Sequence, residues 1–175
     1  MQSESFQKSL KFWAASLDGA ESLLTDLPLD RPRIGVDRKQ SPASPQPVKL
    51  ILPKSLSQAI SAWQAETKTT LFMCMMASLQ LLLHKVCQQT DVCVGSVAAN
   101  RYRPELEPLI GMFVNTLPYR TTIEKEHTFA QIQATVRDLC VNVMRHSVVP
   151  FDMLVHKFAV SLLVFCVLIF LSVTV

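Results

Sequence analysis

Residues 109–120 read LIGMFVNTLPYR and have the pattern of a buried strand that contains one polar amide. Side chains alternate between the two faces of a strand, so Phe113, Asn115 and Leu117 are expected on one face. A buried amide without a hydrogen-bond partner costs about 1–3 kcal/mol, so Asn115 needs partners. Two interpretations remain open. The amide satisfies backbone groups near the strand end, helped by Thr116, or it faces a cavity or an interface and binds a ligand or partner there.

The strand predicted around this segment extends to about Ile123 and contains Pro118. Proline has no N–H to donate to a strand ladder, so the strand is expected to bulge, to end or to form an edge at that residue. The run DVCVGSV (91–97) has apolar residues on both faces and predicts a second strand in a covered sheet. The alternation in VKLILP (48–53) predicts a third strand.

Four segments, 5–18, 55–66, 71–83 and 128–143, have apolar residues at helical spacing. Capping-box spacing marks two of the starts, at Ser55 with Gln58 and at Thr128 with Gln131. Residues 71–83 are apolar nearly all round but too short to span a bilayer, which favours a central core helix. A Pro/Ser/Gln-rich stretch, SPASPQP (41–47), predicts an extended connector.

Composition excludes some classes of function. The 175 residues suffice for one domain, and the net charge of +3 comes from basic residues that are scattered rather than clustered. This distribution argues against nucleic-acid binding. The odd count of five cysteines and the absence of a CxxC motif favour buried reduced thiols over disulfides or a metal site.

The motifs that usually carry catalysis or metal binding are absent from the sequence. It contains no GxSxG, no GxGxxG and no P-loop, and only four glycines. The histidines are isolated from one another, as expected for surface or helix-end positions. They are His84, His127, His146 and His156. No catalytic residue and no metal ligand is therefore predicted.

Seven segments, taken together, resemble the second lobe of a nonribosomal peptide synthetase condensation domain in order and spacing. They are KFWAASLDGA, LPLDRPR, TKTTLFM, QQTDVCVGSVAANR, PELEPLIGMFVNTLPYR, HTFAQI and VVPFDMLV, between residues 6 and about 157. The resemblance implies an α/β fold, a partial chloramphenicol-acetyltransferase-like lobe with a mixed sheet and flanking helices. Residues 1–47 would be an inter-lobe helix and connector, 48–157 the partial lobe and 158–175 an apolar tail.

In the family that this resemblance indicates, two lobes enclose a tunnel. An amide bond forms there between acyl or aminoacyl thioesters that carrier proteins deliver on phosphopantetheine. The catalytic signature HHxxxDG belongs to the first lobe, and this sequence contains no HH pair. The expected partners are therefore carrier proteins and an N-terminal lobe, with no cofactor bound directly and no activity of the chain alone. The alternative is a non-catalytic, membrane-anchored protein that docks carriers.

The resemblance also assigns roles to particular residues. Those expected at the substrate tunnel or the lobe interface are Asn115, Thr116, Arg101 and Arg120. Those expected to form the structural motif are Gly111, Phe113, Pro150, Phe151 and Asp152. Two positions depart from the family, which usually has glycine near Lys68 and a small residue at Gln89; both changes suggest a diverged copy.

The resemblance stops after Phe158, where the sequence continues FAVSLLVFCVLIFLSVTV with three polar residues, Ser161, Ser172 and Thr174. As a helix these residues would extend about 27 Å at roughly 1.5 Å per residue, close to a hydrocarbon core of about 30 Å. Two interpretations remain open, a single-pass membrane anchor and an intron read as coding sequence. The expected location is accordingly cytoplasmic, with the membrane as the alternative.

Overall fold

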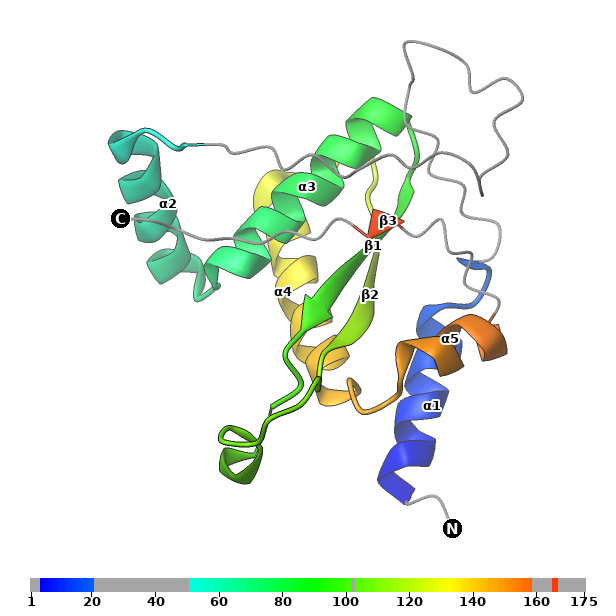
Figure 1. Cartoon of the computed structure of the whole chain (residues 1–175). Coiled ribbons are helices and arrows are strands. Elements are labelled where there is room, and N and C mark those ends of the chain that lie inside the picture. The colour runs from blue at the N-terminus through cyan, green and yellow to red at the C-terminus, as the bar shows by residue number, and fades with distance from the viewer. Residues whose placement is uncertain (1–3, 21–50, 102, 159–164, 167–175) are drawn as a thin grey trace, which may run out of the picture.

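The computed structural model describes residues 4–20, 51–101, 103–158 and 165–166. The chain combines helices with strands, three helices before the paired strands and two after them, which confirms the expected α/β class (Figure 1). The helices are α1 (Glu4–Ser16), α2 (Lys54–Thr67), α3 (Leu71–Cys87), α4 (Phe129–Arg145) and α5 (Phe151–Phe158), with a short 3₁₀ turn η2 (Pro104–Leu106). The strands are β1 (Asp91–Ala98), β2 (Asn115–Thr122) and β3 (Phe165–Cys166).

Side-chain caps fix the starts of two helices. The Thr70 hydroxyl accepts from the N–H of Met73 at the start of α3, and Thr128 with Gln131 forms a complete capping box at α4, as expected. The capping box predicted at Ser55 is wrong. Helix α2 begins one residue earlier, after Pro53, which has no side chain that can accept a hydrogen bond.

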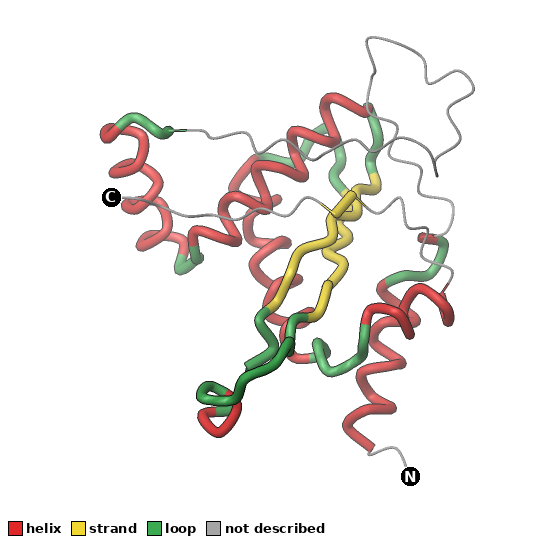
Figure 2. The backbone as a smooth tube through the Cα atoms, in the orientation of Figure 1, coloured by secondary structure: helices red, strands yellow, loops and turns green. Residues whose placement is uncertain are grey.

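The sheet has the order β2-β1-β3. Strands β1 and β2 pair antiparallel over eight residues, from Asp91 opposite Thr122 to Ala98 opposite Asn115 (Figure 2). Within the described residues β2 is an edge strand, as Pro118 requires, because its nitrogen can point away from β1. The strand predicted from residue 109 begins instead at Asn115, and residues 109–114 belong to a loop that projects beyond the paired strands (Figure 2).

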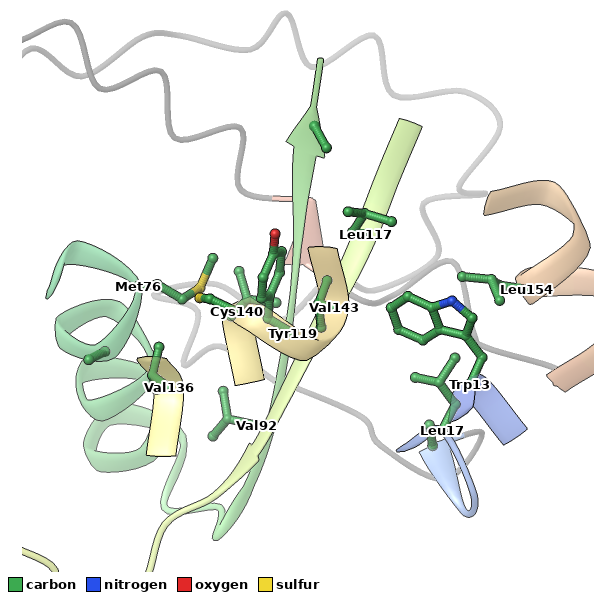
Figure 3. Packing of buried hydrophobic residues seen from close by; sticks show 14 of the residues in the cluster. Trp13, Leu17, Met76, Val92, Leu117, Tyr119, Val136, Cys140, Val143 and Leu154 are labelled. Carbon is green, nitrogen blue, oxygen red and sulfur yellow. The ribbon is translucent and has the colours of Figure 1, made fainter. Parts of the chain in front are cut away.

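Helices α3 and α4 cover one face of this sheet. Their inward side chains pack on alternate residues of the strands in a single core, to which α1 and α5 add a further group (Figure 3). The labelled members are Met76, Val92, Leu117, Tyr119, Val136, Cys140 and Val143 in the first part and Trp13, Leu17 and Leu154 in the second. On α4 the four-residue spacing of Ile132, Val136 and Cys140 places them on one helical face, which explains the clear periodicity of this segment in the sequence.

Some expectations fall outside the described residues. Residues 51–53 of the predicted third strand have no regular secondary structure, and residues 48–50 lie outside the described residues, as does the whole predicted connector, 41–47. In the tail, Phe165–Cys166 is extended and pairs with β1, so these two residues do not continue a helix. Among the described residues no single helix is long and apolar enough to span a membrane; α2 and α3 qualify only as a pair, bent by 104°.

Candidate functional site

Asn115 stands at the start of β2 and bonds to the loop between α4 and α5. Its Nδ2 donates to the carbonyl oxygens of Ser147 and Val149, each at 2.9 Å. Its Oδ1 accepts from the backbone N–H of Phe151 at 3.1 Å. Both donors and one acceptor site of the amide are thus used by backbone groups. These groups lie more than thirty residues away in sequence, not at the end of its own strand.

The loop that Asn115 holds contains the second segment of the resemblance, VVPFD. Val149 is fully buried, Pro150 is exposed, and the carbonyl of Pro150 accepts from the N–H of Leu154 as α5 begins. Asp152 is exposed in the first turn of α5, where the positive end of the helix dipole stabilises its carboxylate. The structure therefore joins Asn115 to the backbone of Val149 and Phe151, the two residues on either side of Pro150.

Arg101 folds the loop that precedes Asn115. Its guanidinium donates to the carbonyls of Leu109 at 3.0 Å and Gly111 at 2.9 Å, and it also donates to the carbonyl of Leu106. It lies over the ring of Phe113, with 4.4 Å between Cζ and the ring centroid. These bonds turn the backbone of 106–111 inward, which explains why the predicted strand does not extend back to residue 109.

The same loop presents apolar side chains to solvent. Leu109, Ile110, Met112 and Val114 are exposed by 48%, 105%, 89% and 47%. Four neighbouring apolar side chains at this exposure form a patch of the kind that marks an interaction surface. We call residues 109–112 with Val114 the apolar loop.

Arg120 lies at the other end of β2 and has different partners. Its Nε and Nη2 form a forked ion pair with the Asp91 carboxylate, the shortest contact being 2.6 Å. Its Nη1 donates to the carbonyls of Ser16 and Asp18 at 3.3 and 2.5 Å, where α1 ends. The hydrogen bond to Asp91 raises the pKa of Arg120 further above its usual range.

The residues expected at the tunnel or interface therefore divide into two groups. Arg101 and Asn115 act at the start of β2, whereas Arg120 is five residues further along, about 17 Å away at 3.3–3.4 Å per residue. Thr116 is partly exposed and, by strand alternation, shares the face of Pro118 and Arg120. That any of these residues lines a tunnel stays a prediction.

Sequence reasoning missed two partners of this region, Ser147 and Asp91. Asp91 opens the predicted strand 91–97 and Arg120 lies near the end of the next strand, but their pairing depends on the strand register, which the sequence alone does not specify. Ser147 acts through its backbone carbonyl, which no side-chain pattern reveals.

Among the described residues, no group of three histidine, cysteine, aspartate or glutamate side chains could hold a metal ion. Burial raises the pKa of both Cys93 and Cys140 to about 12, so these thiols stay protonated near neutral pH. Cys74, Cys93 and Cys140 are buried with free thiols, as the cysteine pattern predicts, whereas Cys87 is only partly buried.

The comparisons with known proteins agree on one family. The family model described as "Condensation domain" matches residues 1–163. The chain is 37% identical over 157 residues to a linear gramicidin synthase of Brevibacillus parabrevis, a match that covers 90% of this chain and 2% of that protein. It is 36% identical over 148 residues to phosphinothricin tripeptide synthetase PhsC of Streptomyces viridochromogenes, covering 85% and 13%.

Solved structures share the fold at lower identity. The four-domain nonribosomal peptide synthetase holo-AB3403 matches with a TM-score of 0.76 at 23% identity, over 91% of this chain and 12% of that one. The X-domain from teicoplanin biosynthesis matches with a TM-score of 0.77 at 24% identity, over 90% and 34%. The chain thus spans only a small part of the length of these relatives. On these matches and on its mixed α/β architecture, the chain belongs to the condensation domain family of nonribosomal peptide synthetases.

Proposed function

We propose that this chain supplies the second-lobe half of a condensation reaction centre, in which an amide bond forms between two carrier-bound thioesters. The observation that carries the proposal is the junction at Asn115. It joins the segment LIGMFVNTLPYR to the segment VVPFD through three hydrogen bonds. The two most specific parts of the family pattern in this chain therefore form one rigid unit, not two independent motifs.

In the proposed reaction no residue of this chain forms a covalent bond to a substrate. The acceptor amine nitrogen attacks the donor thioester carbonyl, a C–N bond forms, the C–S bond breaks, and the carrier thiol leaves with a proton equivalent from the amine. The sequence contains no HHxxxDG, so the histidine expected to handle that proton would come from a first lobe. In this proposal the residues of this chain form part of the tunnel wall and orient the first lobe and the carrier proteins.

Asn115 fits a positioning role better than a proton-transfer role. Its two N–H groups are committed to the carbonyls of Ser147 and Val149, and an amide does not titrate near neutral pH. One lone pair of Oδ1 is left for a substrate N–H. Asn115 would therefore hold the 147–151 loop at the tunnel wall and accept at most one hydrogen bond from a bound acyl-amine.

The apolar loop is the surface that we assign to contact with the first lobe. Arg101 holds its backbone by several hydrogen bonds, so the exposed side chains of Ile110 and Met112 are presented from a fixed frame. Burial of preorganised apolar side chains stabilises an interface at low entropic cost. The substrates would arrive on the phosphopantetheine arms of carrier proteins, with no cofactor bound by this chain itself.

The test is complementation between two separate chains. The full chain is mixed with a first lobe that carries HHxxxDG and with loaded donor and acceptor carriers, and the condensed product is detected by mass spectrometry. Product is expected from the pair and not from either half alone. The matched control replaces the second histidine of HHxxxDG by alanine in the first lobe, and this pair should form no product above the carrier-only background.

Product from this chain alone would overturn the proposed division of labour. A pair that binds tightly but forms no product would overturn the assignment of this chain to the reaction centre. Ile110→Glu with Met112→Glu tests the contact surface. The double variant should weaken binding of the first lobe at least tenfold while leaving thermal unfolding of the chain unchanged, because both side chains are exposed.

A further inference from the structure

Helix α2 is the least embedded α-helix of the described residues. None of its side chains is buried, whereas α1, α3, α4 and α5 each bury at least one. In Figure 1 it stands apart from the sheet and joins α3 through a short turn, with a bend of 104° between the two helices. The position of α2 must therefore depend on a small number of particular contacts.

An apolar groove of about 470 Å³ lies in the angle between α2 and α3. The apolar stripe of α2 faces this groove instead of a packed surface, and Leu56 remains 46% exposed. The one hydroxyl in the lining, that of Ser78, already donates to the carbonyl of Cys74 at 2.9 Å. The hydrophobic effect therefore favours movement of α2 toward α3. The lining residues are Leu52, Leu56, Ala59, Ile60, Trp63, Cys74, Met75, Ser78 and Phe129.

A buried amide on α4 opposes that movement. Gln133 is only 1% exposed, and its Oε1 accepts from Nε1 of Trp63 at 2.6 Å. Its Nε2 donates to the hydroxyls of Thr69 at 2.6 Å and Thr67 at 3.3 Å. Trp63 thus lines the groove and is also bound to α4. We call the hydrogen bond between Gln133 and Trp63 the latch.

The turn after α2 contains a single residue suited to act as a hinge, Lys68. It ends the helix in the left-handed conformation, with a φ of 52°, which a residue other than glycine adopts rarely. Its N–H donates to the carbonyl of Gln64, and α3 begins only after Thr70, whose hydroxyl caps that helix. A hollow of about 300 Å³ between this turn and α4 leaves room for rotation. Trp63 lies five residues before Lys68, about 7.5 Å at roughly 1.5 Å per residue, so a swing of about 20° would break the latch.

From these observations we propose that α2 is a hinged flap that turns at Lys68, is held open by the latch and closes over the groove when the latch breaks. In the closed position the stripe of α2 packs on Cys74 and Met75 of α3 and on Phe129 of α4. Closure buries apolar surface but deprives a buried amide of a partner, so the two positions oppose each other in free energy. The flap makes the groove a gated apolar site. This proposal does not depend on the condensation reaction.

Gln133→Leu in the full chain tests the latch, because leucine fills the site but cannot accept a hydrogen bond from Trp63. Spin labels on p-acetylphenylalanine at the exposed positions 58 and 85 report the angle between α2 and α3 without using the native cysteines. Position 58 is ten residues from Lys68, about 15 Å at roughly 1.5 Å per residue, so closure by about 20° should shorten the label distance by about 3–5 Å. The matched control, Asn142→Leu, removes an exposed amide from the same helix and should leave the distance unchanged.

A second variant removes the latch from its other side. Trp63→Phe keeps an aromatic ring in the groove but has no N–H to donate to Gln133. It should shorten the distance as Gln133→Leu does, and the double variant should add no further change, since both substitutions break the same bond. Iodide quenching checks Gln133→Leu without labels. Trp13 is only 1% exposed, so the signal reports on Trp63, and closure should lower its Stern–Volmer constant at least twofold.

Three results would overturn the proposal. An unchanged distance in either single variant that melts cooperatively would show that the latch does not hold α2 open. A broad distribution of distances, with hydrogen-exchange protection lost over residues 54–67, would show that α2 needs the latch to remain helical. A Stern–Volmer constant that rises in Gln133→Leu would show that α2 moves away from the groove when the bond is lost.

Discussion

The side-chain amide of Asn115 donates to the carbonyl of Val149 at 2.9 Å, across 34 residues of sequence. With the bonds to Ser147 and Phe151, this contact ties the first residue of β2 to the start of α5. The amide would destabilise the apolar segment if it had no partners, but with these hydrogen bonds it connects β2 to α5. Removing it should separate them.

Substitution of Asn115 by alanine should cost about 1–3 kcal/mol of unfolding free energy, because buried carbonyls and an N–H lose their partner. Substitution by aspartate should cost more at pH 7, since a carboxylate would face two carbonyl oxygens and can donate to neither. Urea unfolding of both variants gives the comparison. Thr116→Ala, next to it on the partly exposed face, is the control and should change stability by less than about 0.5 kcal/mol.

The aspartate variant carries a further consequence. Two carbonyl oxygens facing the carboxylate disfavour its charged form, so its pKa in the folded state should lie above the usual value of an aspartate. Protonation also restores one donor, so the stability of this variant relative to the wild type should improve as the pH falls through that raised pKa toward the usual one. If the alanine and aspartate variants were both as stable as the wild type and only product formation fell, Asn115 would serve the substrate and not the backbone.

The sequence allows the elements around Asn115 to be predicted but not the contact itself. Apolar periodicity and a capping box locate α4 closely, because a helix that buries one face leaves that pattern. Strand β2 begins six residues later than predicted. Apolar letters at 109–114 suggest burial, whereas the backbone there is held by Arg101 and the side chains face solvent. A side chain that bonds to carbonyls leaves no periodic signal.

The contacts of Arg101 and Arg120 could not be predicted from the sequence either. The resemblance assigns both residues to a tunnel or interface. In the structure each of them organises backbone, Arg101 within its own loop and Arg120 between β2 and the end of α1. Long-range partners such as Asp91 depend on strand register, which a single sequence does not specify at this level.

The Arg120–Asp91 pair should contribute measurable coupling. Its side chains are 20% and 26% exposed and its geometry is forked, so a double-mutant cycle to alanine should give about 1–2 kcal/mol. The Arg137–Asp138 pair is the internal control. With exposures of 39% and 67% it should give a coupling of less than about 0.5 kcal/mol.

Lysine at position 120 separates charge from geometry. Arg120→Lys keeps the positive charge but cannot bond Asp91 and the carbonyls of Ser16 and Asp18 at once. Limited proteolysis near Asp18 should therefore accelerate in this variant while the core melts almost as before. Equal proteolysis rates in the two proteins would show that α1 is held by its apolar contacts alone.

Acidification should loosen α1 through His146. The Ser9 hydroxyl donates to the Ser5 carbonyl, so it accepts from Nδ1–H of His146, whose ring stacks on Phe12 at 4.3 Å. Burial, with a smaller effect of Arg145, lowers the pKa of His146 below its usual 6.5. The unfolded chain then binds a proton that the folded chain resists. Stability is full above pH 6.5 and falls as the pH drops through the folded-state pKa.

Urea midpoints between pH 7.5 and 5 measure this effect. His146→Asn should flatten the dependence, because asparagine can donate to Ser9 but does not titrate in this range. An unchanged profile in the His146 variant would assign the acid sensitivity to other groups.

Arg101→Lys should unfold the apolar loop without unfolding the domain. One ammonium cannot reach the carbonyls of Leu106, Leu109 and Gly111 together, and it lacks the planar face that lies over Phe113. Local opening of an exposed loop costs less than global unfolding, so hydrogen exchange at residues 104–114 should rise at least tenfold while the melting temperature changes by less than about 2 °C. Arg103→Lys, on an exposed side chain in the same loop, should leave exchange as it is. If exchange rose equally in both variants, the order of the loop would not depend on the bonds of Arg101 in particular. If the melting temperature fell with the exchange protection, the loop and the core would form one cooperative unit, and the apolar loop could not be altered independently to test its contact with a first lobe.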